Sequence, residues 1–381
     1  MAIPQTSLRY AMGVNMKKKL LSLLMAGVLV VFTLSACANK DKNEANDNSA
    51  AGDSAVTEDG TAPDTAAGDE NTAGTTGTTE EKEKVRIVLD WTPNTNHTGL
   101  YVAQAKGFFD AAGLEVEIMQ PPEGSTTELV GAGGAEFGIS FQDTLAPAYA
   151  SENSMPVTAV AAIIQHNTSG ILSLKKTGID TPAKMAGHSY ATWDSPIELA
   201  IIKKVVEDDG GKYDDIKLIP NTVTDVVTAL QTDIESIWVY YAWDGMAAKV
   251  AGLDTNYLNF ADYGTELDYY SPVLIANNDY LSKNPETAKK FLDAVRQGYE
   301  YAIENPDDAA DILVKAVPEL NAALVKESQN WLKDQYMAEV PQWGYIDPAR
   351  WDGFYAWLYN NKLIEKEIPA GTGFSNEFLS E

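Results

Sequence analysis

The sequence predicts an α/β protein of two lobes, preceded by an export signal and an acidic linker. Strand-like and helix-like segments alternate from Val85 onward, which predicts mostly parallel sheets covered by helices on both faces. The alternation runs in two successive series and then gives way to helices only. Because each series is close to the size of an ordinary domain, we expect lobe I at residues 85–176 plus 272–381 and lobe II at residues 177–271.

The strands are expected where short apolar or alternating runs are bounded by turn residues. These runs are 85–89, 114–118, 137–141, 157–164, 171–174, 189–192, 216–219, 237–240 and 272–276. Helices are expected at 97–106, 126–131, 144–151, 195–208, 223–233 and 242–251, and then from 277 to about 361. Several helix starts combine a capping residue with proline, as in Ser195-Pro196, Asn284-Pro285, Asn305-Pro306 and Asp347-Pro348.

The N-terminus has the pattern of an export signal. Met16 is followed by three lysines and an apolar run over 20–34, which is too short for a comfortable membrane span. We interpret residues 1–15 as an upstream extension and residues 1–36 as the signal peptide. The run ends in Leu34-Ser35-Ala36-Cys37, which resembles the lipobox of bacterial lipoproteins, so we expect a lipid on Cys37. An ordinary cleaved signal or an uncleaved anchor is the alternative.

Residues 37–84 are expected to form the lipid anchor and a disordered acidic linker. The stretch from Asn39 is rich in Thr, Gly, Ala, Asp, Glu and Asn and has almost no large apolar residue. It therefore cannot bury enough surface to offset the entropy lost on ordering. Such a tether keeps the lobes near the membrane and leaves them free to move.

Charge and cysteine content exclude several classes of function. The chain carries 55 acidic and 28 basic residues, a formal net charge of −27. A surface that acidic repels phosphate backbones and anionic headgroups, so we expect no nucleic acid and no membrane contact except through the lipid. Cys37 is the only cysteine, which excludes a disulfide, a Cys-based zinc site and a thiol nucleophile in the lobes.

The loops that follow the predicted strands indicate the ligand class. In an open α/β sheet, ligands bind where these loops converge. The loops offer aromatic, carboxylate and carboxamide side chains and no Lys or Arg, with Asp143, Asp244 and Tyr269 among them. Such loops suit a flat heteroaromatic ligand that is uncharged or weakly cationic. Helix N-termini alone can hold anions, so an anionic ligand is disfavoured and not excluded.

We select twelve candidate ligand-binding residues from these loops and from the adjoining helix starts. They are Asp90, Trp91, Asn94, His97, Gln142, Gln165, Trp193, Glu198, Tyr240, Tyr241, Trp243 and Tyr270. Three have a structural alternative. Trp91 could pack between the lobes, His97 could only occupy a first helical turn, and Glu198 could be used in a capping box with Ser195.

Catalytic motifs are absent from the sequence. It contains no nucleophile elbow, no H-E-x-x-H, no Walker A motif and no dinucleotide fingerprint. Its three histidines are dispersed, so a metal site would need carboxylates alone. We therefore expect no enzyme activity, no metal and no cofactor.

The segment Asp90–Ala103, which begins D-W-T-P-N-T-N-H-T-G, closely resembles the opening of bacterial ThiY-like solute-binding proteins. Looser matches follow at Lys106–Phe109, Gly113–Val116, Glu136–Ser140, Trp193–Pro196, Trp238–Asp244 and Asp268–Val273, and the resemblance spans about residues 85–365. These proteins are part of the SsuA/thiamine-pyrimidine-synthase-like group. The resemblance implies the type II periplasmic-binding-protein fold, with a ligand cleft between two lobes.

The resemblance also implies a function. It implies that a monomeric, extracytoplasmic protein, lipid-anchored to the cell membrane, captures a thiamine-related pyrimidine for the permease of an ABC importer. The solute would be a formylaminopyrimidine or hydroxymethylpyrimidine. Trp91 and a tyrosine from the 240–241 or 269–270 pairs would stack on its ring, and Asp90, Asn94 and Glu198 would bind its edge.

Other roles of this group remain as alternatives. Riboflavin or an alkanesulfonate- or nitrate-type anion could be the solute instead. A eukaryotic branch of the group is an enzyme that synthesises the pyrimidine and uses a cysteine-rich motif. That motif is missing here, since the single cysteine lies in the signal, and its absence disfavours synthase activity.

Overall fold

The computed structural model describes residues 81–120, 124–152, 154–221 and 223–379. The export signal, Cys37 and the linker up to residue 80 lie outside the described residues, so their expected roles stay predictions. No helix in the described part of the chain combines the length and the apolar character needed to cross a membrane.

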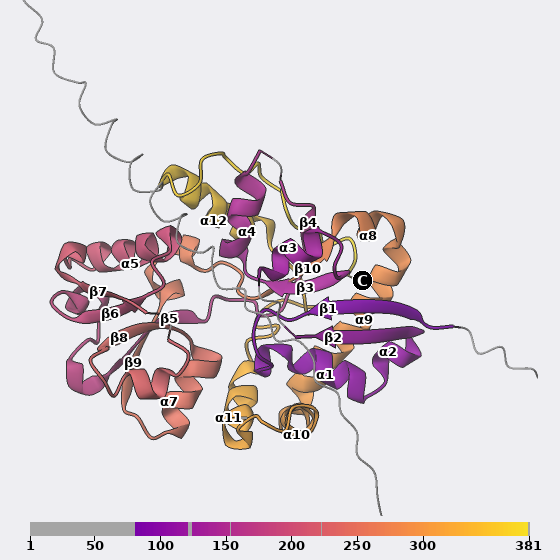
Figure 1. The fold of residues 1–381 in the computed structure, drawn as a ribbon, viewed down its shortest axis with the longest axis horizontal. Coiled ribbons are helices and arrows are strands. Elements are labelled where there is room, and N and C mark those ends of the chain that lie inside the picture. Colours follow the sequence, from indigo (N-terminus) through magenta and orange to yellow (C-terminus); the bar gives the residue numbers. More distant parts are fainter. Residues whose placement is uncertain (1–80, 121–123, 153, 222, 380–381) are drawn as a thin grey trace, which may run out of the picture. The chain divides into compact units, whose positions relative to one another are not determined.

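The first sheet has, among the described residues, five strands in the order β2-β1-β3-β10-β4 (Figure 1). They are β1 (Glu83–Val88), β2 (Leu114–Met119), β3 (Phe137–Ser140), β4 (Val157–Ala162) and β10 (Val273–Asn277). β1 is parallel to β2 and β3, whereas β10 is antiparallel to β3 and β4. β10 is buried throughout, which explains its unbroken apolar run.

Helices cover both faces of this sheet (Figure 1). On one face, α1 (Thr98–Ala105), α2 (Phe108–Ala111) and α9 (Pro285–Glu304) pack against Val85 and Ile87. On the other face, α3 (Thr126–Gly131), α4 (Gln142–Ala150) and α12 (Pro348–Asn360) pack near Val88. α8 (Asn278–Lys283) follows β10 directly. The amphipathic character of α9 suits this position between the sheet and the solvent.

The second sheet has five strands within the described residues, in the order β7-β6-β8-β5-β9 (Figure 1). They are β5 (Ser169–Leu174), β6 (Ser189–Thr192), β7 (Lys217–Pro220), β8 (Ser236–Tyr240) and β9 (Thr255–Asn259). α5 (Pro196–Asp208) packs over Tyr190 and Trp238 on one face. α6 (Val226–Ala229) and α7 (Met246–Val250) pack over Ile237 and Val239 on the other.

The two sheets share one design. In each, three neighbouring strands are parallel and the fourth runs antiparallel to both of its neighbours. The antiparallel strand is β10 in the first sheet and β5 in the second, and each is the strand that the chain enters on arriving from the other sheet. We call residues 163–168 the first crossover and residues 260–272 the second crossover.

The sequence prediction needs correction at three places. The boundary predicted at residue 176 lies too late, because β5 already belongs to the second sheet. β9 was not predicted, since its sequence TNYLN has no clear alternation and only Leu258 is buried. The helix predicted at 242–251 starts as η5 (Tyr241–Gly245), a π-helical turn, and the α-helix α7 begins only at Met246.

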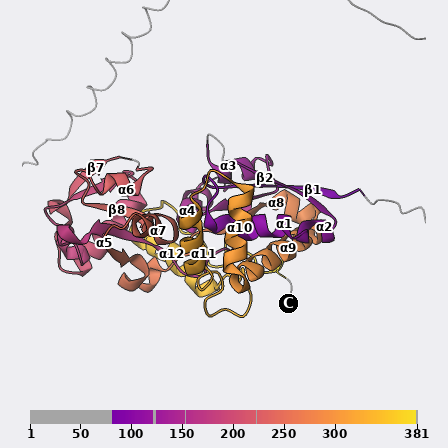
Figure 2. The ribbon, with the colours of Figure 1, turned by 90° about the horizontal axis from the view of Figure 1, so that it is seen from below.

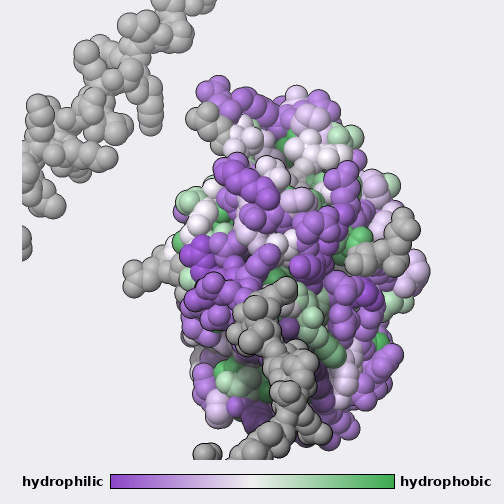
Figure 3. Space-filling view, turned by 90° about the vertical axis from the view of Figure 1, so that its right-hand side faces the viewer, coloured by the Kyte–Doolittle hydropathy of each residue, from purple (hydrophilic) through white to green (hydrophobic). Residues whose placement is uncertain are grey.

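Helices α10 (Pro306–Ala316) and α11 (Ala322–Leu332) lie next to each other, with α11 beside α7 (Figure 2). α11 follows β10 in the chain, and Leu332 at its end joins the core of the first sheet. Helix α11 therefore connects the core of the first sheet to α7, a helix that covers the second sheet. The face of the molecule shown in Figure 3 is mainly hydrophilic, with scattered apolar residues.

Candidate functional site

Side chains from both sheets meet where β1, β3 and β8 end. The rings of Phe141, directly after β3, and Tyr240, at the end of β8, stack with centroids 5.5 Å apart and planes 24° apart. Ser271 of the second crossover lies close to the Tyr240 hydroxyl, although its Oγ completes no hydrogen bond. The first sheet, the second sheet and a crossover thus each contribute to one group of residues.

Asp90 follows β1 and is held by His97. The backbone N–H of Asn94 donates to His97 Nδ1 at 3.2 Å, so the ring proton resides on Nε2. Nε2 lies 2.8 Å from Asp90 Oδ1 and donates to it. His97 is fully buried, and the Asn94 side chain accepts from the Asn96 N–H as a helix cap. Within the described structure, His97 and Asn94 therefore orient Asp90.

Two further aspartates lie at the same place. Asp143 is in the first turn of α4, and its Oδ1 is buried with no hydrogen-bond partner among the described residues. Burial raises the pKa of Asp143 to about 6. Burial also raises the pKa of Asp244 to about 6, against a weak bond from the Tyr240 backbone N–H to its Oδ2 at 3.3 Å. Backbone N–H groups offset only part of this effect, those of Thr144 and Asp143 at Asp143 and that of Tyr240 at Asp244.

Buried tyrosines close to these carboxylates have raised pKa values. Burial, and next the charge of Asp143, holds the pKa of Tyr240 well above its usual range, and Asp90 and Asp244 act in the same direction. The pKa of Tyr269 is raised by burial and Asp143 in the same way. The Tyr269 hydroxyl is also buried without a partner. Unpaired buried polar atoms are uncommon and costly, so this group is suited to a ligand that supplies their partners.

Two tryptophans in the loops after β1 and β6 expose apolar ring surface. Trp91, next to Asp90, is 50% exposed and has no ring stacked on it in the described part of the chain. Trp193, after β6, is 44% exposed, and its ring centroid lies 5.6 Å from that of Trp238. The Trp238 Nε1 is buried and has no hydrogen-bond partner among the described residues. Exposed indole faces can stack on a flat ligand at little cost in conformational entropy.

The charges at this site are of one sign. Among the described residues, no Lys or Arg forms an ion pair with Asp90, Asp143 or Asp244. No group of His, Cys, Asp or Glu in the described part is arranged to hold a metal ion. The site therefore favours a ligand rich in N–H donors or carrying positive charge, and it repels an anion.

Several predicted residues use their polar groups elsewhere. Glu198 accepts from the Tyr190 hydroxyl at 2.7 Å, from Thr192 Oγ1 at 3.0 Å and from the Trp193 N–H, and it closes the predicted capping box. Gln142 and Tyr270 bind each other's backbone. The Gln142 amide donates to the Trp351 carbonyl, the Gln142 carbonyl accepts from the Tyr355 hydroxyl, and the Tyr270 hydroxyl accepts from the Asp347 N–H, so these residues stabilise the fold around the site.

Tyr241 and Trp243 connect the two sheets' helices. The Tyr241 ring stacks on Tyr257 at 4.2 Å and meets the edge of Trp331 of α11 at 5.3 Å. Trp243 packs against the apolar cluster formed by α10 and α11. In the described structure, no contact brings Tyr241 or Trp243 to the three aspartates. We therefore leave both residues out of the candidate site.

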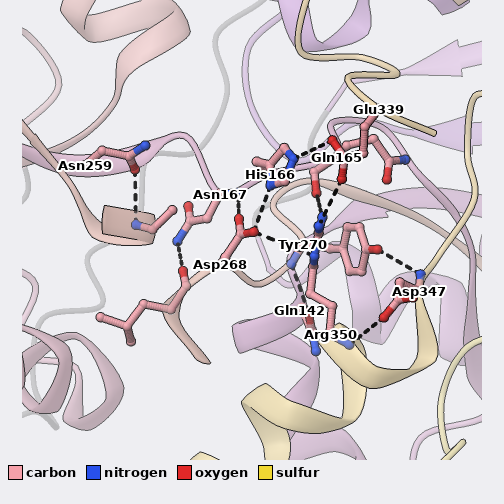
Figure 4. A network of polar contacts seen from close by, with 12 residues as sticks. Gln142, Gln165, His166, Asn167, Asn259, Asp268, Tyr270, Glu339, Asp347 and Arg350 are labelled. Carbon is pink, nitrogen blue, oxygen red and sulfur yellow. Dashed lines mark hydrogen bonds and ion pairs between the residues drawn. The ribbon is translucent and has the colours of Figure 1, made fainter. Parts of the chain in front are cut away.

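A polar network joins the two crossovers to the C-terminal segment (Figure 4). His166 of the first crossover contacts Asp268 of the second through Nδ1 at 2.7 Å and Glu339 through Nε2 at 2.8 Å. Arg350 of α12 pairs with both carboxylates. Gln165 donates to the Tyr345 carbonyl at 3.0 Å, while its Oε1 stays buried without a partner among the described residues. Gln165 thus belongs to this network.

The sequence prediction missed four residues of the candidate site, Phe141, Asp143, Asp244 and Ser271, and it named Tyr269 only as one member of the 269–270 pair. Asp143, Asp244 and Tyr269 stand in the loops that it examined, but Gln142, Trp243 and Tyr270 were chosen beside them. Neighbouring residues in a helical turn point about 100° apart, and only the packing decides which one faces the site. Phe141 and Ser271 carry no charge and gave no signal, although Phe141 follows a strand directly.

Comparisons with known proteins identify the family of this chain. A family described as NMT1/THI5 like matches residues 94–309. A formylaminopyrimidine-binding protein of Halalkalibacterium halodurans is 30% identical over 308 residues, which cover 78% of this chain and 91% of the relative. A 4-amino-5-hydroxymethyl-2-methylpyrimidine phosphate synthase of Saccharomyces cerevisiae is 26% identical over 318 residues, covering 78% and 88%.

Solved structures show the same fold. The alkanesulfonate-binding protein SsuA from Xanthomonas axonopodis pv. citri, bound to MOPS, superposes with a TM-score of 0.60 at 14% identity. The match covers 79% of this chain and 100% of SsuA. It confirms the expected fold, two α/β lobes of the periplasmic-binding-protein type.

Proposed function

Because the chain belongs to the NMT1/THI5-like family, we propose that it is the solute-binding subunit of an ABC importer and that its solute is a thiamine-related aminopyrimidine. The observation that carries the proposal is the buried, unpaired Oδ1 of Asp143 beside two tyrosines and two further aspartates. An aminopyrimidine brings N–H donors on the edge of a flat ring. Formylaminopyrimidine, the solute in the name of the relative at 30% identity, has this chemistry.

Each part of the site has a task in this proposal. Asp90, oriented by His97, and Asp143 accept hydrogen bonds from the ring's amino groups. Tyr240, backed by Phe141 at 5.5 Å, lies against the ring from the second sheet. Trp91 supplies a free indole face from the first sheet. The lobes close on the ring about the two crossovers, which removes water and strengthens each hydrogen bond.

Two other functions fit the site less well. An alkanesulfonate or nitrate would meet three carboxylates and no paired cation at this place, which is the wrong sign for an anion. A pyrimidine synthase is the name of several relatives, but the cysteine-rich motif of that activity is missing from a chain with one cysteine. We therefore propose capture of the pyrimidine without turnover.

The cellular setting completes the proposal. We propose that the protein works outside the cytoplasm as a monomer, held by a lipid on Cys37 and by the acidic linker, and that it delivers its solute to the membrane permease. The support is the sequence pattern before residue 85 and the fold that the chain shares with a periplasmic aliphatic sulphonate-binding protein from Escherichia coli.

Thermal unfolding of the full chain with different solutes tests the proposal. A ligand that binds only the folded state raises the melting temperature in a saturable way. We expect a rise of a few degrees with formylaminopyrimidine or hydroxymethylpyrimidine and none with an alkanesulfonate or nitrate. Replacing Trp91 by Ala should abolish the rise and leave the ligand-free melting temperature unchanged, because the indole is half exposed.

Tyr359→Ala is the matched control, since this exposed tyrosine lies on α12 and should change neither value. A shift with riboflavin alone would reassign the solute, and a shift with the anions alone would overturn the proposal. Mass spectrometry of the bound pyrimidine before and after incubation separates capture from synthesis, because an enzyme would change the mass of its ligand.

A further inference from the structure

Helix α11 contacts the helical segments that follow β8 of the second sheet. Glu327 pairs with Lys249 of α7 at 2.8 Å, and Trp331 meets the ring edge of Tyr241. Ser328 lies between them in sequence and is fully buried. A serine inside a helix normally returns its hydroxyl to the carbonyl four residues earlier. Ser328 instead bonds to segments outside its own helix.

The hydroxyl of Ser328 completes a directed chain of hydrogen bonds. It donates to the carbonyl of Ala242, so its single proton is used there. The hydroxyl of Thr95, 2.5 Å away, must then be the donor to Ser328 Oγ. Thr95, Ser328 and Ala242 are all buried. The chain therefore runs from Thr95 through α11 to Ala242 without access to solvent.

The two ends of this chain adjoin the two halves of the site. Thr95 begins η1 (Thr95–His97), the turn that holds His97 against Asp90. The Thr95 carbonyl is fixed in turn by the Tyr336 hydroxyl at 2.7 Å. Ala242 lies in η5, between Tyr240 and Asp244. Ser328 thus joins a segment of the first sheet to a segment of the second.

We propose that Ser328 is a positioning residue for ligand capture. Its hydroxyl holds the segment of Asp90 and His97 at a fixed distance from the segment of Tyr240 and Asp244, so that both halves of the site meet the ligand together. This inference deepens the proposed function and rests on it. Loss of the hydroxyl leaves a buried donor on Thr95 and a buried acceptor on Ala242 without a partner, and both segments loosen.

Hydrogen exchange of the ligand-free full chain is the first test, because it does not depend on the identity of the solute. In Ser328→Ala, the amides of residues 94–98 and of residues 241–246 should both exchange faster, since each segment loses the same anchor. Faster exchange confined to α11 would overturn the proposal. The control Glu327→Gln removes an exposed ion pair, which contributes little, and should leave both segments unchanged.

Stopped-flow tryptophan fluorescence with an aminopyrimidine is the second test. We expect Ser328→Ala to raise the dissociation rate about tenfold and to change the association rate less than about twofold, because most changes at a binding site act on dissociation. An unchanged dissociation rate would overturn the proposal. If the wild type binds no aminopyrimidine, the proposed solute is wrong, and the exchange experiment still decides the role of Ser328.

A second substitution keeps the proposal testable if Ser328→Ala does not fold. Thr95→Val preserves the volume of the side chain and removes only the donor at the start of the chain. It should accelerate exchange in residues 94–98 and raise the dissociation rate. The double variant should add little to either single one, because both break the same chain. Full additivity of the two substitutions would contradict a shared role.

Discussion

The three aspartates of the site differ in how the chain stabilises their charge. Asp90 receives a hydrogen bond from a buried histidine, and Asp244 receives only a weak one from the backbone of Tyr240. Asp143 Oδ1 has no partner in the described structure. A residue that a fold leaves in this state destabilises the protein without ligand and is positioned to bind one, which is typical of functional sites.

Replacing Asp143 by Asn should therefore separate stability from binding. The folded pKa is raised from 3.8 to about 6, so the folded state loses stability as the pH rises through this window. At pH 7.5 the variant lacks the buried charge of Asp143, and we expect a higher melting temperature without ligand. Its affinity for an aminopyrimidine should be about tenfold lower, because a charged acceptor is lost.

The pH dependence of binding gives a second readout of the same substitution. Wild-type affinity should fall as the pH drops through about 6, where Asp143 becomes protonated. That inflection should be smaller in Asp143→Asn, and the part that remains belongs to Asp244, whose pKa is also raised to about 6. Calorimetric titrations between pH 5 and about 8 would show it, and identical profiles of the two proteins would exclude Asp143 from the site.

At the scale of elements, the contact of α1 with α9 fixes the helix that follows the Asp90 loop. Gly99 of α1 and Gly298 of α9 lie against each other, and a Cβ on Gly298 would come within 2.0 Å of the Gly99 carbonyl oxygen. This atom belongs to the backbone and cannot move aside. The two glycines therefore allow α1 to pack closely enough to hold η1, with Thr95 and His97, in place.

Gly298→Ala should separate these helices and destabilise the protein by about 1–3 kcal/mol, the usual cost of overpacking. It should also weaken solute binding, because η1 moves with α1. Urea unfolding and a binding titration measure the two effects. Gly353→Ala, in α12, is the matched control, since nothing lies within 4 Å of the added atom, and it should retain both stability and affinity.

At the scale of the whole molecule, the crossovers are held by a charged network centred on His166. Each ring nitrogen of His166 faces a carboxylate, Asp268 on one side and Glu339 on the other. A carboxylate only accepts, so both nitrogens must donate and the ring must carry a proton on each. The hydrogen bond to Asp268 first, and then that to Glu339, raise the pKa of His166, while burial and the charge of Arg350 oppose them.

This network predicts a loss of stability in alkaline solution. The stabilisation is fully present below pH 6.5 and disappears as the pH rises through the raised pKa of the folded state. Because His166 is about one-third exposed, we expect a contribution of about 1 kcal/mol or less. Urea unfolding at a series of pH values would reveal it.

His166→Gln should lack this component, because its amide donates on one side only, and Glu339→Gln should show less of it. The difference between wild type and His166→Gln should therefore shrink as the solution is made alkaline. A constant difference across the series would show that the ring is not doubly protonated in the folded protein.

The sequence by itself determined the order of elements and the chemistry of the loops. Hydrophobic periodicity located most strands because buried β-strands leave continuous or alternating apolar runs. Cap-then-proline signals marked helix starts, and the Asp347 side chain caps α12 as expected. The aromatic and acidic composition of the strand-end loops predicted the ligand class, since composition does not depend on which side chain finally turns inward.

Only the tertiary structure decided which of those side chains bond within the fold and which keep unpaired polar atoms. From the sequence, Glu198 is a candidate ligand-binding residue. In the structure, its oxygens accept hydrogen bonds from Tyr190, Thr192 and Trp193. In the sequence, Asp143 and its neighbour Gln142 are equally good candidates. In the structure, Gln142 Oε1 accepts from the Tyr270 N–H, whereas Asp143 Oδ1 has no partner among the described residues. Such outcomes depend on hydrogen-bond partners that are distant in the chain, as Ser328 is from Thr95, and local sequence carries no record of them.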